Sequence, residues 1–173
     1  MNYLVRRMIT IKVTQKILAP VEQVCQVLLD HQQLDRFFNA QVALVKNQNA
    51  GELIGGEGAV RRISIGKIVF EEEVVSASLE HICYRIIGSW PVADHQGDIR
   101  LIPQVIPREA PQKEPQVSSL DSNSNNDSTQ LDYVIKFNGP KWLPDFLLKF
   151  FVGRDIVNAM NKLADHFAAK EVA

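Results

Sequence analysis

Several features that would point to a particular chemistry are scarce or absent in this sequence. Its 173 residues include only two cysteines, Cys25 and Cys83, and their separation does not match metal-ligand spacing. The four histidines show no such spacing either. No phosphate-binding loop, zinc-protease helix or nucleophile elbow occurs. We therefore expect no metal and no cofactor. We interpret both cysteines as buried thiols.

Net charge and long apolar runs are also lacking. The 19 basic and 20 acidic residues give a formal net charge of -1, so no overall field attracts a polyanion and we expect no nucleic-acid partner. Residues 146–152 form the nearest approach to an apolar run, but Lys149 interrupts them, and spanning a bilayer takes about 20 apolar residues. No secretory cleavage pattern follows the first strand. We expect a soluble cytoplasmic protein without stable membrane insertion, of undetermined oligomeric state.

What is present is enough apolar material for one sizeable core. With 46% hydrophobic and 23% charged residues, we expect residues 1–173 to form a single domain. Alternation with a period of two predicts strands, and apolar spacings of three and four predict helices. The predicted strands cover residues 8–17, 42–47, 58–65, 67–76, 82–88, 95–106 and 129–138, and the predicted helices cover residues 21–30, 32–38 and 142–170. One strand, two short helices, an antiparallel meander and a long helix belong to the α+β class.

The last helix and the sheet each carry an apolar face that must be buried. This predicts a sheet curled around the helix, an arrangement that tends to enclose a cavity. The helix positions expected to face inward are Leu143, Leu147, Phe150, Val157, Met160, Ala164 and Phe167. Other apolar residues widen this surface, and they fit a cavity lining, a dimer contact or contact with a membrane during ligand exchange. Gly153 predicts either a kink in the helix or close packing against a neighbour.

Residues 107–128 differ from the rest of the chain in composition. Three prolines are followed by a run of serine, asparagine and aspartate, which cannot bury enough apolar surface to offset the entropy of ordering. We interpret the segment as a mobile hairpin insertion. A functional lid is the alternative.

Several local motifs, in this order and spacing, together resemble one known family. They are APVEQV at residues 19–24, GAVRRI at 58–63, EEV at 72–74, YRI at 84–86, PVADHQGDIRLIP at 91–103 and TQLDY at 129–133. The chain outside the insertion resembles the polyketide cyclase and dehydrase branch of the START-like superfamily, also called SRPBCC proteins. This resemblance implies a helix-grip fold, in which a curved antiparallel sheet wraps a long C-terminal helix around a deep pocket. Members bind lipids, hormones, polyketides or other hydrophobic small molecules, and only some are enzymes.

Alternation and the resemblance together predict which side chains face the cavity. In the last strand Tyr133 and Ile135 share an apolar face, and Ile99 and Leu101 share a face with His95. The resemblance places Tyr84 and Glu72 inward, and Arg61 would then need a carboxylate such as Glu72. The candidate ligand-binding residues are Arg61, Glu72, Tyr84, His95, Ile99, Leu101, Tyr133, Ile135 and Phe150.

Each polar candidate also has a purely structural interpretation. Arg61 and Glu72 fit an ion pair across neighbouring strands as well as a ligand contact. His95 fits a hydrogen-bonded strand residue or a general base. Tyr84 and Tyr133 fit core residues whose hydroxyl groups find partners.

Three functions follow from this pattern. The first is binding or transport of a hydrophobic small molecule, such as a lipid, an isoprenoid or an aromatic or polyketide-like compound, in the central cavity. The second is an enzyme of the cyclase or dehydratase type, in which His95, Tyr84 or Glu72 moves a proton. The third is a protein-interaction module that uses the surface of the last helix.

Overall fold

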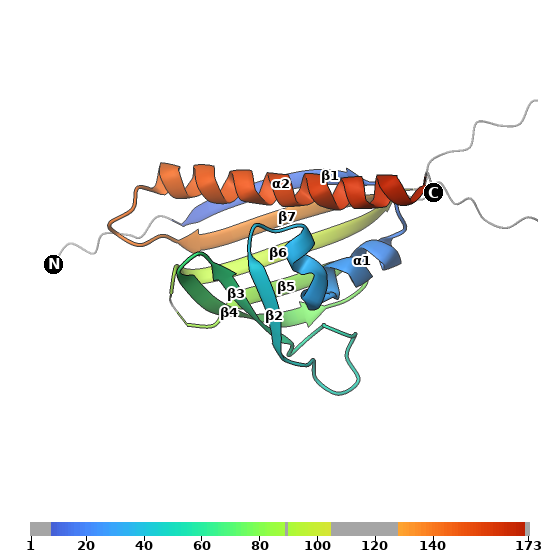
Figure 1. Cartoon of the computed structure of the whole chain (residues 1–173), viewed down its shortest axis with the longest axis horizontal. Helices are drawn as coiled ribbons and strands as arrows, with labels where there is room; N and C mark the ends of the chain where they lie inside the picture. Colours follow the sequence, from blue (N-terminus) through green and yellow to red (C-terminus); the bar gives the residue numbers. More distant parts are fainter. Residues whose placement is uncertain (1–7, 89, 105–127, 172–173) are drawn as a thin grey trace, which may run out of the picture.

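The computed structural model describes residues 8–88, 90–104 and 128–171 (Figure 1). In this part of the chain the strands are β1 (Ile9–Ile17), β2 (Gln41–Lys46), β3 (Val60–Ile65), β4 (Ile68–Ala77), β5 (His81–Ile86), β6 (Ala93–Gln104) and β7 (Ser128–Asn138). The helices are α1 (Val21–Leu29), the short 3-10 helix η1 (His31–Arg36) and the long α2 (Asp145–Glu171). The predicted order of elements is confirmed.

The strands form one curved antiparallel sheet in the order β1-β7-β6-β5-β4-β3-β2. The helices lie on its concave side, with α2 running along β1 and β7 and the α1–η1 pair facing the middle of the sheet (Figure 1). This is the α+β helix-grip arrangement. Its register places Arg61 opposite Glu72 and Ile99 opposite Tyr133, so residues far apart in sequence meet on the inner face.

Strand alternation sorts side chains between the two faces of the sheet as predicted. Along β7, Leu131, Tyr133, Ile135 and Phe137 are all buried. On the outer face, Arg62 binds Glu71 across the β3–β4 pair, with 2.8 Å between Nη2 and Oε1. The outer face is therefore held by cross-strand pairs, while the inner face supplies the core.

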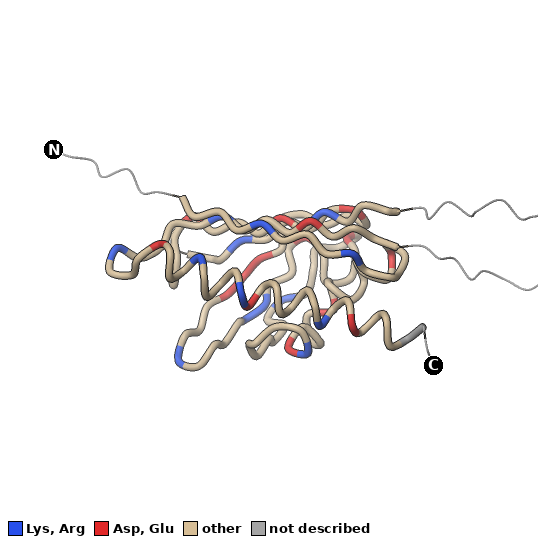
Figure 2. Tube along the Cα trace, turned by 90° about the horizontal axis from the view of Figure 1, so that it is seen from above, with Lys and Arg blue, Asp and Glu red and all other residues tan. Residues whose placement is uncertain are grey.

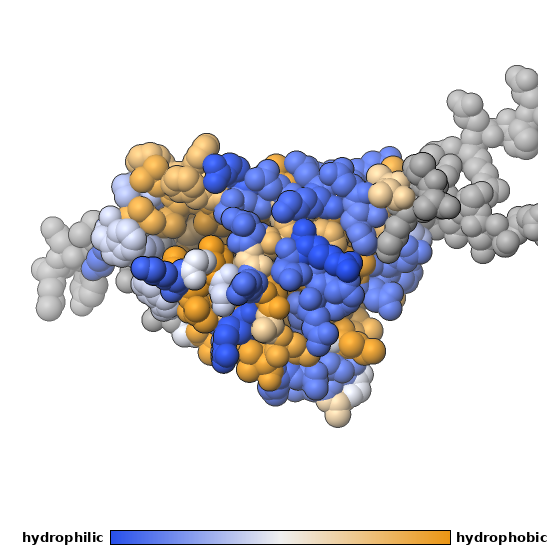
Figure 3. Space-filling model, viewed as in Figure 1, coloured by the Kyte–Doolittle hydropathy of each residue, from blue (hydrophilic) through white to orange (hydrophobic). Residues whose placement is uncertain are grey.

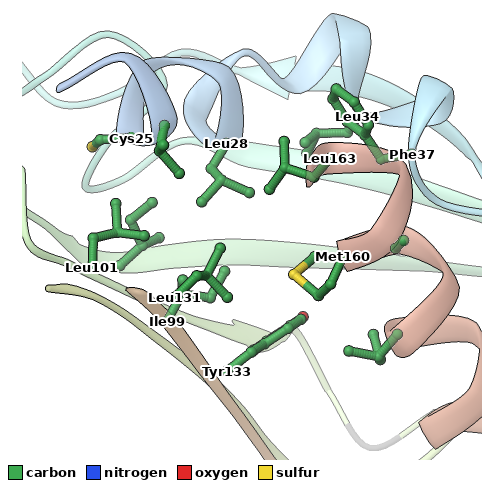
Figure 4. Packing of buried hydrophobic residues seen from close by; sticks show 14 of the residues in the cluster. Cys25, Leu28, Leu34, Phe37, Ile99, Leu101, Leu131, Tyr133, Met160 and Leu163 are labelled. Carbon is green, nitrogen blue, oxygen red and sulfur yellow. The ribbon is translucent and has the colours of Figure 1, made fainter. Parts of the chain in front are cut away.

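The core is concentrated where α1, η1 and the second half of α2 meet the sheet (Figure 4). Pro20 stands immediately before α1, where its missing amide hydrogen leaves no helical hydrogen bond unmade. Along α1, apolar residues at helical spacing, including Val24 and Leu28, are buried against the sheet. Cys25 is buried, as expected, and Cys83 is partly buried in β5.

The inward face of α2 differs from the predicted one. Ile156, Ala159, Met160, Leu163 and Phe167 form the buried stripe. The prediction was correct for Met160 and Phe167 and wrong for Phe150 and Val157, which are 61% and 42% exposed. The error arose because this helix is apolar on more than one side, so spacing alone allowed more than one choice of inner face.

Of the two effects expected of Gly153, close packing against a neighbour is not found. α2 is continuous from Asp145 to Glu171, so there is no helix break at this position. A Cβ at position 153 would meet only the Cγ2 of Ile11, at an ordinary contact distance of 3.8 Å. The packing therefore does not require glycine here.

The predicted insertion at residues 107–128 lies almost entirely outside the described residues. Its flanking strands do pair, with Gln104 opposite Ser128. The segment therefore connects two neighbouring strands. Among the described residues, no helix combines the length and the apolar character needed to cross a membrane.

Candidate functional site

The centre of the site is an ion pair across β3 and β4. Arg61 and Glu72 are opposite each other in the register, and both Nε and Nη2 of Arg61 lie 2.8 Å from Oε2 of Glu72. Their side chains are only 12% and 10% exposed. Burial alone would lower the pKa of Arg61, but the negative charge of Glu72 opposes this effect and the net result is a raised pKa. The guanidinium is therefore charged at neutral pH, and the carboxylate of Glu72 is its counter-ion.

His31, at the start of η1, supports this pair from the helical side. Its Nε2 lies 2.8 Å from the carbonyl oxygen of Gly55, which can only accept a hydrogen bond, so Nε2 carries the proton. Nδ1 then accepts from Nη1 of Arg61, 3.5 Å away. Burial, and next the charge of Arg61, lower the pKa of His31 to about 4. The imidazole is therefore neutral at pH 7.

Tyr84 and Tyr133 extend this cluster of polar side chains across the sheet. The guanidinium carbon of Arg61 lies 4.6 Å from the centroid of the Tyr84 ring, a cation–π contact. The Tyr84 hydroxyl group is hydrogen-bonded to that of Tyr133. Burial raises the pKa of both phenols. Both are therefore neutral donors and acceptors at neutral pH.

Gly97 on β6 makes this arrangement possible. It lies opposite Tyr84 in the register, and a Cβ at position 97 would overlap the Tyr84 ring. The ring can therefore cross β6 only because position 97 has no side chain. A glycine inside an alternating strand often marks such a close approach.

Among the described residues, His95 is the polar candidate with a ring nitrogen, Nδ1, that has no hydrogen-bond partner. Its ring lies 5.6 Å from that of Tyr84, between centroids. Its Nδ1 atom is buried and has no partner among the described residues. Burial lowers the pKa of His95, so the ring is neutral at pH 7. A buried polar nitrogen without a partner is uncommon in a native protein and calls for an explanation.

The five polar candidates lie together in one cluster, called the polar group below: Arg61, Glu72, Tyr84, His95 and Tyr133. The apolar candidates are placed differently. Ile99, Leu101 and Ile135 are buried in the packed core. Phe150 lies on the exposed side of α2, away from the polar group, so its prediction as a cavity-facing residue is wrong. Its side chain points outward because the buried stripe follows Ile156 and Met160 instead.

Of the five polar candidates, His95 lies nearest the less covered end of the sheet, because the start of β6 pairs with the end of β7, after which α2 follows. No residue of α2 from Asp145 to Asp155 is buried, whereas the second half of the helix is sealed against the core. Figure 3 shows the surface recessed beneath the first half of α2. Two other depressions, of about 530 and 430 Å³, lie around η1, β2 and the polar side of α2, and none of the five polar candidates lines them. We therefore take the recess under α2 as the candidate site.

Sequence reasoning missed two residues of this group. His31 gave no signal, because a single histidine in a short 3-10 helix has no periodic pattern that reveals its partner. Gly97 did give one, since it interrupts the side-chain alternation of a predicted strand. Its position opposite Tyr84 required the register of the sheet.

Comparisons with known proteins identify the fold of this chain. No protein-family model and no curated protein sequence matches the chain. Among solved structures, a START superfamily protein from Mycobacterium smegmatis is 13% identical with a TM-score of 0.66, over 92% of this chain and 97% of that one. XoxI from Bacillus cereus is 12% identical with a TM-score of 0.62, over 94% and 97%. An uncharacterized protein from Bacillus thuringiensis is 14% identical with a TM-score of 0.63, over 92% and 99%.

These likenesses cover nearly the whole length of each neighbour and agree with the topology described above. At such low identity they do not single out the cyclase branch or any ligand. The chain has the START-like helix-grip fold.

Proposed function

We propose that this protein binds a hydrophobic small molecule that carries a polar group. The ligand lies in the recess between the first half of α2 and the inner face of the sheet. Its apolar part contacts the partly buried side chains Leu148 and Val152 and the sheet, and its polar part meets His95. A lipid, an isoprenoid or an aromatic compound with one hydroxyl, carbonyl or carboxyl group has this chemistry.

The observation that carries the proposal is the buried Nδ1 of His95, which has no hydrogen-bond partner in the part of the chain that the structure describes. Burying a polar atom without a hydrogen bond is unfavourable, by about 1–3 kcal/mol. The other polar groups of the site satisfy one another: Glu72 binds Arg61, and Tyr84 binds Tyr133. His95 is thus the group left to orient a ligand, which is how small-molecule sites combine apolar walls with few polar contacts.

The first test is to look for a molecule that accompanies the protein. The full-length chain is purified, native mass spectra are recorded, and the protein is then extracted with organic solvent. A stoichiometric hydrophobic species in both measurements supports the proposal and identifies the ligand class. An empty protein that also fails the binding assay below contradicts it.

The binding assay uses 1-anilinonaphthalene-8-sulfonate as a fluorescent probe, displaced by palmitate, geraniol or 2-naphthol. His95→Ala should weaken binding of the best competitor about fivefold, the equivalent of one hydrogen bond of about 1 kcal/mol. His81→Ala is the matched control, because His81 binds Asp98 elsewhere on the sheet, 2.6 Å away, and takes no part in the polar group. Equal affinities for the wild type and the His95 variant would exclude the proposed role of His95.

A second candidate is catalysis in the same recess. His95 is neutral at pH 7, and its free Nδ1 is able to accept a proton from a bound substrate. The neutral Tyr84 hydroxyl is a donor nearby. If the protein is an enzyme, His95→Ala should lower turnover by about two to four orders of magnitude while probe binding persists.

A further inference from the structure

The first half of α2 exposes three phenylalanines that do not contribute to the core. Phe146 is 70% exposed, Phe150 is 61% exposed and Phe151 is 49% exposed. Figure 3 shows apolar side chains gathered over this end of the helix. Large aromatic side chains left in water on one short helical segment are unfavourable in a protein that acts only in solution.

The same end of the molecule collects further apolar side chains from three loops. Because the strands are antiparallel, the β3–β4 turn, the β5–β6 loop and the β7–α2 loop all lie at the end where α2 begins (Figure 1). They carry Ile65 and Ile68, Trp90, and Trp142, each at least 40% exposed. We call Ile65, Ile68, Trp90, Trp142, Phe146 and Phe150 the apolar rim.

Basic residues accompany the apolar rim. Lys67 lies in the β3–β4 turn, Lys141 precedes α2 and Lys149 lies in its second turn, and all three are exposed. Figure 2 shows basic positions on the loops and helix at this end of the molecule. Within the described part of the chain, none of them has an acidic partner at ion-pair distance. Among the acidic residues of this region, Glu71 follows Lys67 in the chain and is paired with Arg62, and Asp145 lies between Lys141 and Lys149. Asp94, near Trp90, accepts a hydrogen bond from Asn138.

We propose that the apolar rim docks on the surface of an anionic membrane. Tryptophan and phenylalanine favour the boundary between lipid head groups and acyl chains, and lysines beside them bind anionic head groups. A second copy of the chain is the less suitable occupant, because a two-fold contact through the rim would bring the lysines of both copies together.

This docking would place the recess under α2 at the membrane surface. A hydrophobic ligand could then pass between bilayer and protein without crossing water. The inference goes beyond the proposed function and does not rest on it, since vesicle binding is measured without any ligand.

The experiment uses the full-length protein and two kinds of vesicle, pure phosphatidylcholine and a mixture with about 30% anionic phosphatidylglycerol. Trp90 and Trp142 are the two tryptophans of the sequence, and both belong to the rim. We expect binding to the anionic vesicles, a blue shift of tryptophan emission and quenching by lipids with brominated acyl chains.

Phe146→Ser combined with Phe150→Ser should weaken vesicle binding at least about tenfold. Lys67→Glu, Lys141→Glu and Lys149→Glu together should weaken it about a hundredfold.

Matched controls come from the opposite end of the molecule. Ile54 is 86% exposed and Leu79 is 45% exposed, in the β2–β3 and β4–β5 loops, so changing both to serine removes similar apolar surface away from the rim. Lys16→Glu with Lys46→Glu provides the charge control. Unchanged circular dichroism would show that the variants fold, as their exposure leads us to expect.

Three results would overturn the inference. One is no binding to anionic vesicles at low salt. The second is equal binding by the rim and control variants. The third is a dimer in analytical ultracentrifugation that the Phe146 and Phe150 changes dissociate, which would assign the rim to a second copy.

Discussion

Tyr84 reaches Tyr133 only because position 97 carries no side chain. The Tyr84 ring crosses β6 at Gly97 and lies beside the guanidinium of Arg61. One missing methyl group therefore allows a cation–π contact and a hydrogen bond between two buried phenols.

Gly97→Ala should therefore destabilise the protein by about 1–3 kcal/mol, the usual range for overpacking a filled core. Urea denaturation measures this change. Gly153→Ala is the matched control: its new methyl group meets only Ile11 at ordinary contact distance, and alanine stabilises a helix by up to about 1 kcal/mol relative to glycine. If both substitutions changed stability equally, the close approach of Tyr84 to β6 would be contradicted.

The Arg61–Glu72 pair allows its structural and ligand roles to be separated. Glu72→Leu should destabilise the fold by about 3 kcal/mol or more, because it leaves a buried guanidinium without its carboxylate. Adding Arg61→Met should restore part of that loss, since the orphaned charge is removed. Denaturation of both single variants and the double variant gives the coupling between them.

The double variant then decides between the two interpretations. A folded double variant that still binds the fluorescent probe assigns the pair to structure alone. A folded double variant that no longer binds it assigns the pair to the ligand site.

His31 makes stability depend on pH. Its folded pKa of about 4 lies below the ordinary value of 6.5, so between these pH values the unfolded chain binds a proton that the folded protein does not. Stability contributed by the neutral ring is fully present above pH 6.5 and is lost as pH falls toward 4, by about 3 kcal/mol.

The measurement is the unfolding free energy of the wild type and His31→Gln at several pH values from about 4 to 7, the window set by the two pKa values. The variant should show a shallower decline, because glutamine does not titrate. His81→Gln is the control, since His81 is 40% exposed. A decline equally steep in the wild type and His31→Gln would mean that the buried imidazole does not contribute to it.

At the scale of elements, α2 divides into two parts with different partners. Its second half is packed between η1 and the sheet through Met160 and Leu163 (Figure 4). Its first half has no buried residue up to Asp155. The helix is continuous, so the packed half holds the other half over the recess.

Paired substitutions test this division. Met160→Ala should destabilise the protein by about 2–5 kcal/mol, because Met160 is fully buried. Phe150→Ala, which removes a larger side chain, should change stability by less than about 0.5 kcal/mol, because Phe150 is 61% exposed. Urea denaturation measures both. A larger effect at Phe150 would restore the inward position predicted from the sequence.

The sequence predicted the strands better than the inner face of the long helix, for a physical reason. In β7 the large apolar residues Leu131, Tyr133, Ile135 and Phe137 occupy every second position, and the intervening positions are polar except for Val134, so only one choice of face buries the large apolar set. In α2 apolar residues occur on several sides, because some of them form the core and others lie in the exposed apolar rim. The prediction therefore placed Phe150 and Val157 in the buried stripe and left Ile156 out of it, while it placed Met160 correctly.

Part of the site was also predictable and part was not. Arg61 had to find a carboxylate if it faced inward, and alternation together with the family resemblance pointed to Glu72. The contact of His31 with Arg61 joins η1 to β3 and depends on how the chain closes in space. Such a contact leaves no pattern in the residues around either partner.

For the whole molecule, the two ends of the sheet differ in how completely they are covered. At one end α1, η1 and the second half of α2 close over Leu101 and Leu131. At the other end, three loops and the first half of α2 surround the recess and carry the apolar rim. Stability is therefore concentrated at the closed end, and the open end is the part most able to change shape when a ligand or membrane binds.

Amide hydrogen exchange tests this asymmetry directly. Residues 149–155 and 156–165 belong to one continuous helix, so differences between them report packing rather than helix formation. We expect amides in residues 149–155 to exchange at least about tenfold faster, because Val152, the apolar residue that packs against the core there, is only partly buried. A bound ligand should slow exchange in that segment and leave residues 156–165 unchanged. Uniform protection along the helix would instead mean that the first half is fixed as firmly as the second, and the recess would then be too rigid to admit a ligand from beneath α2.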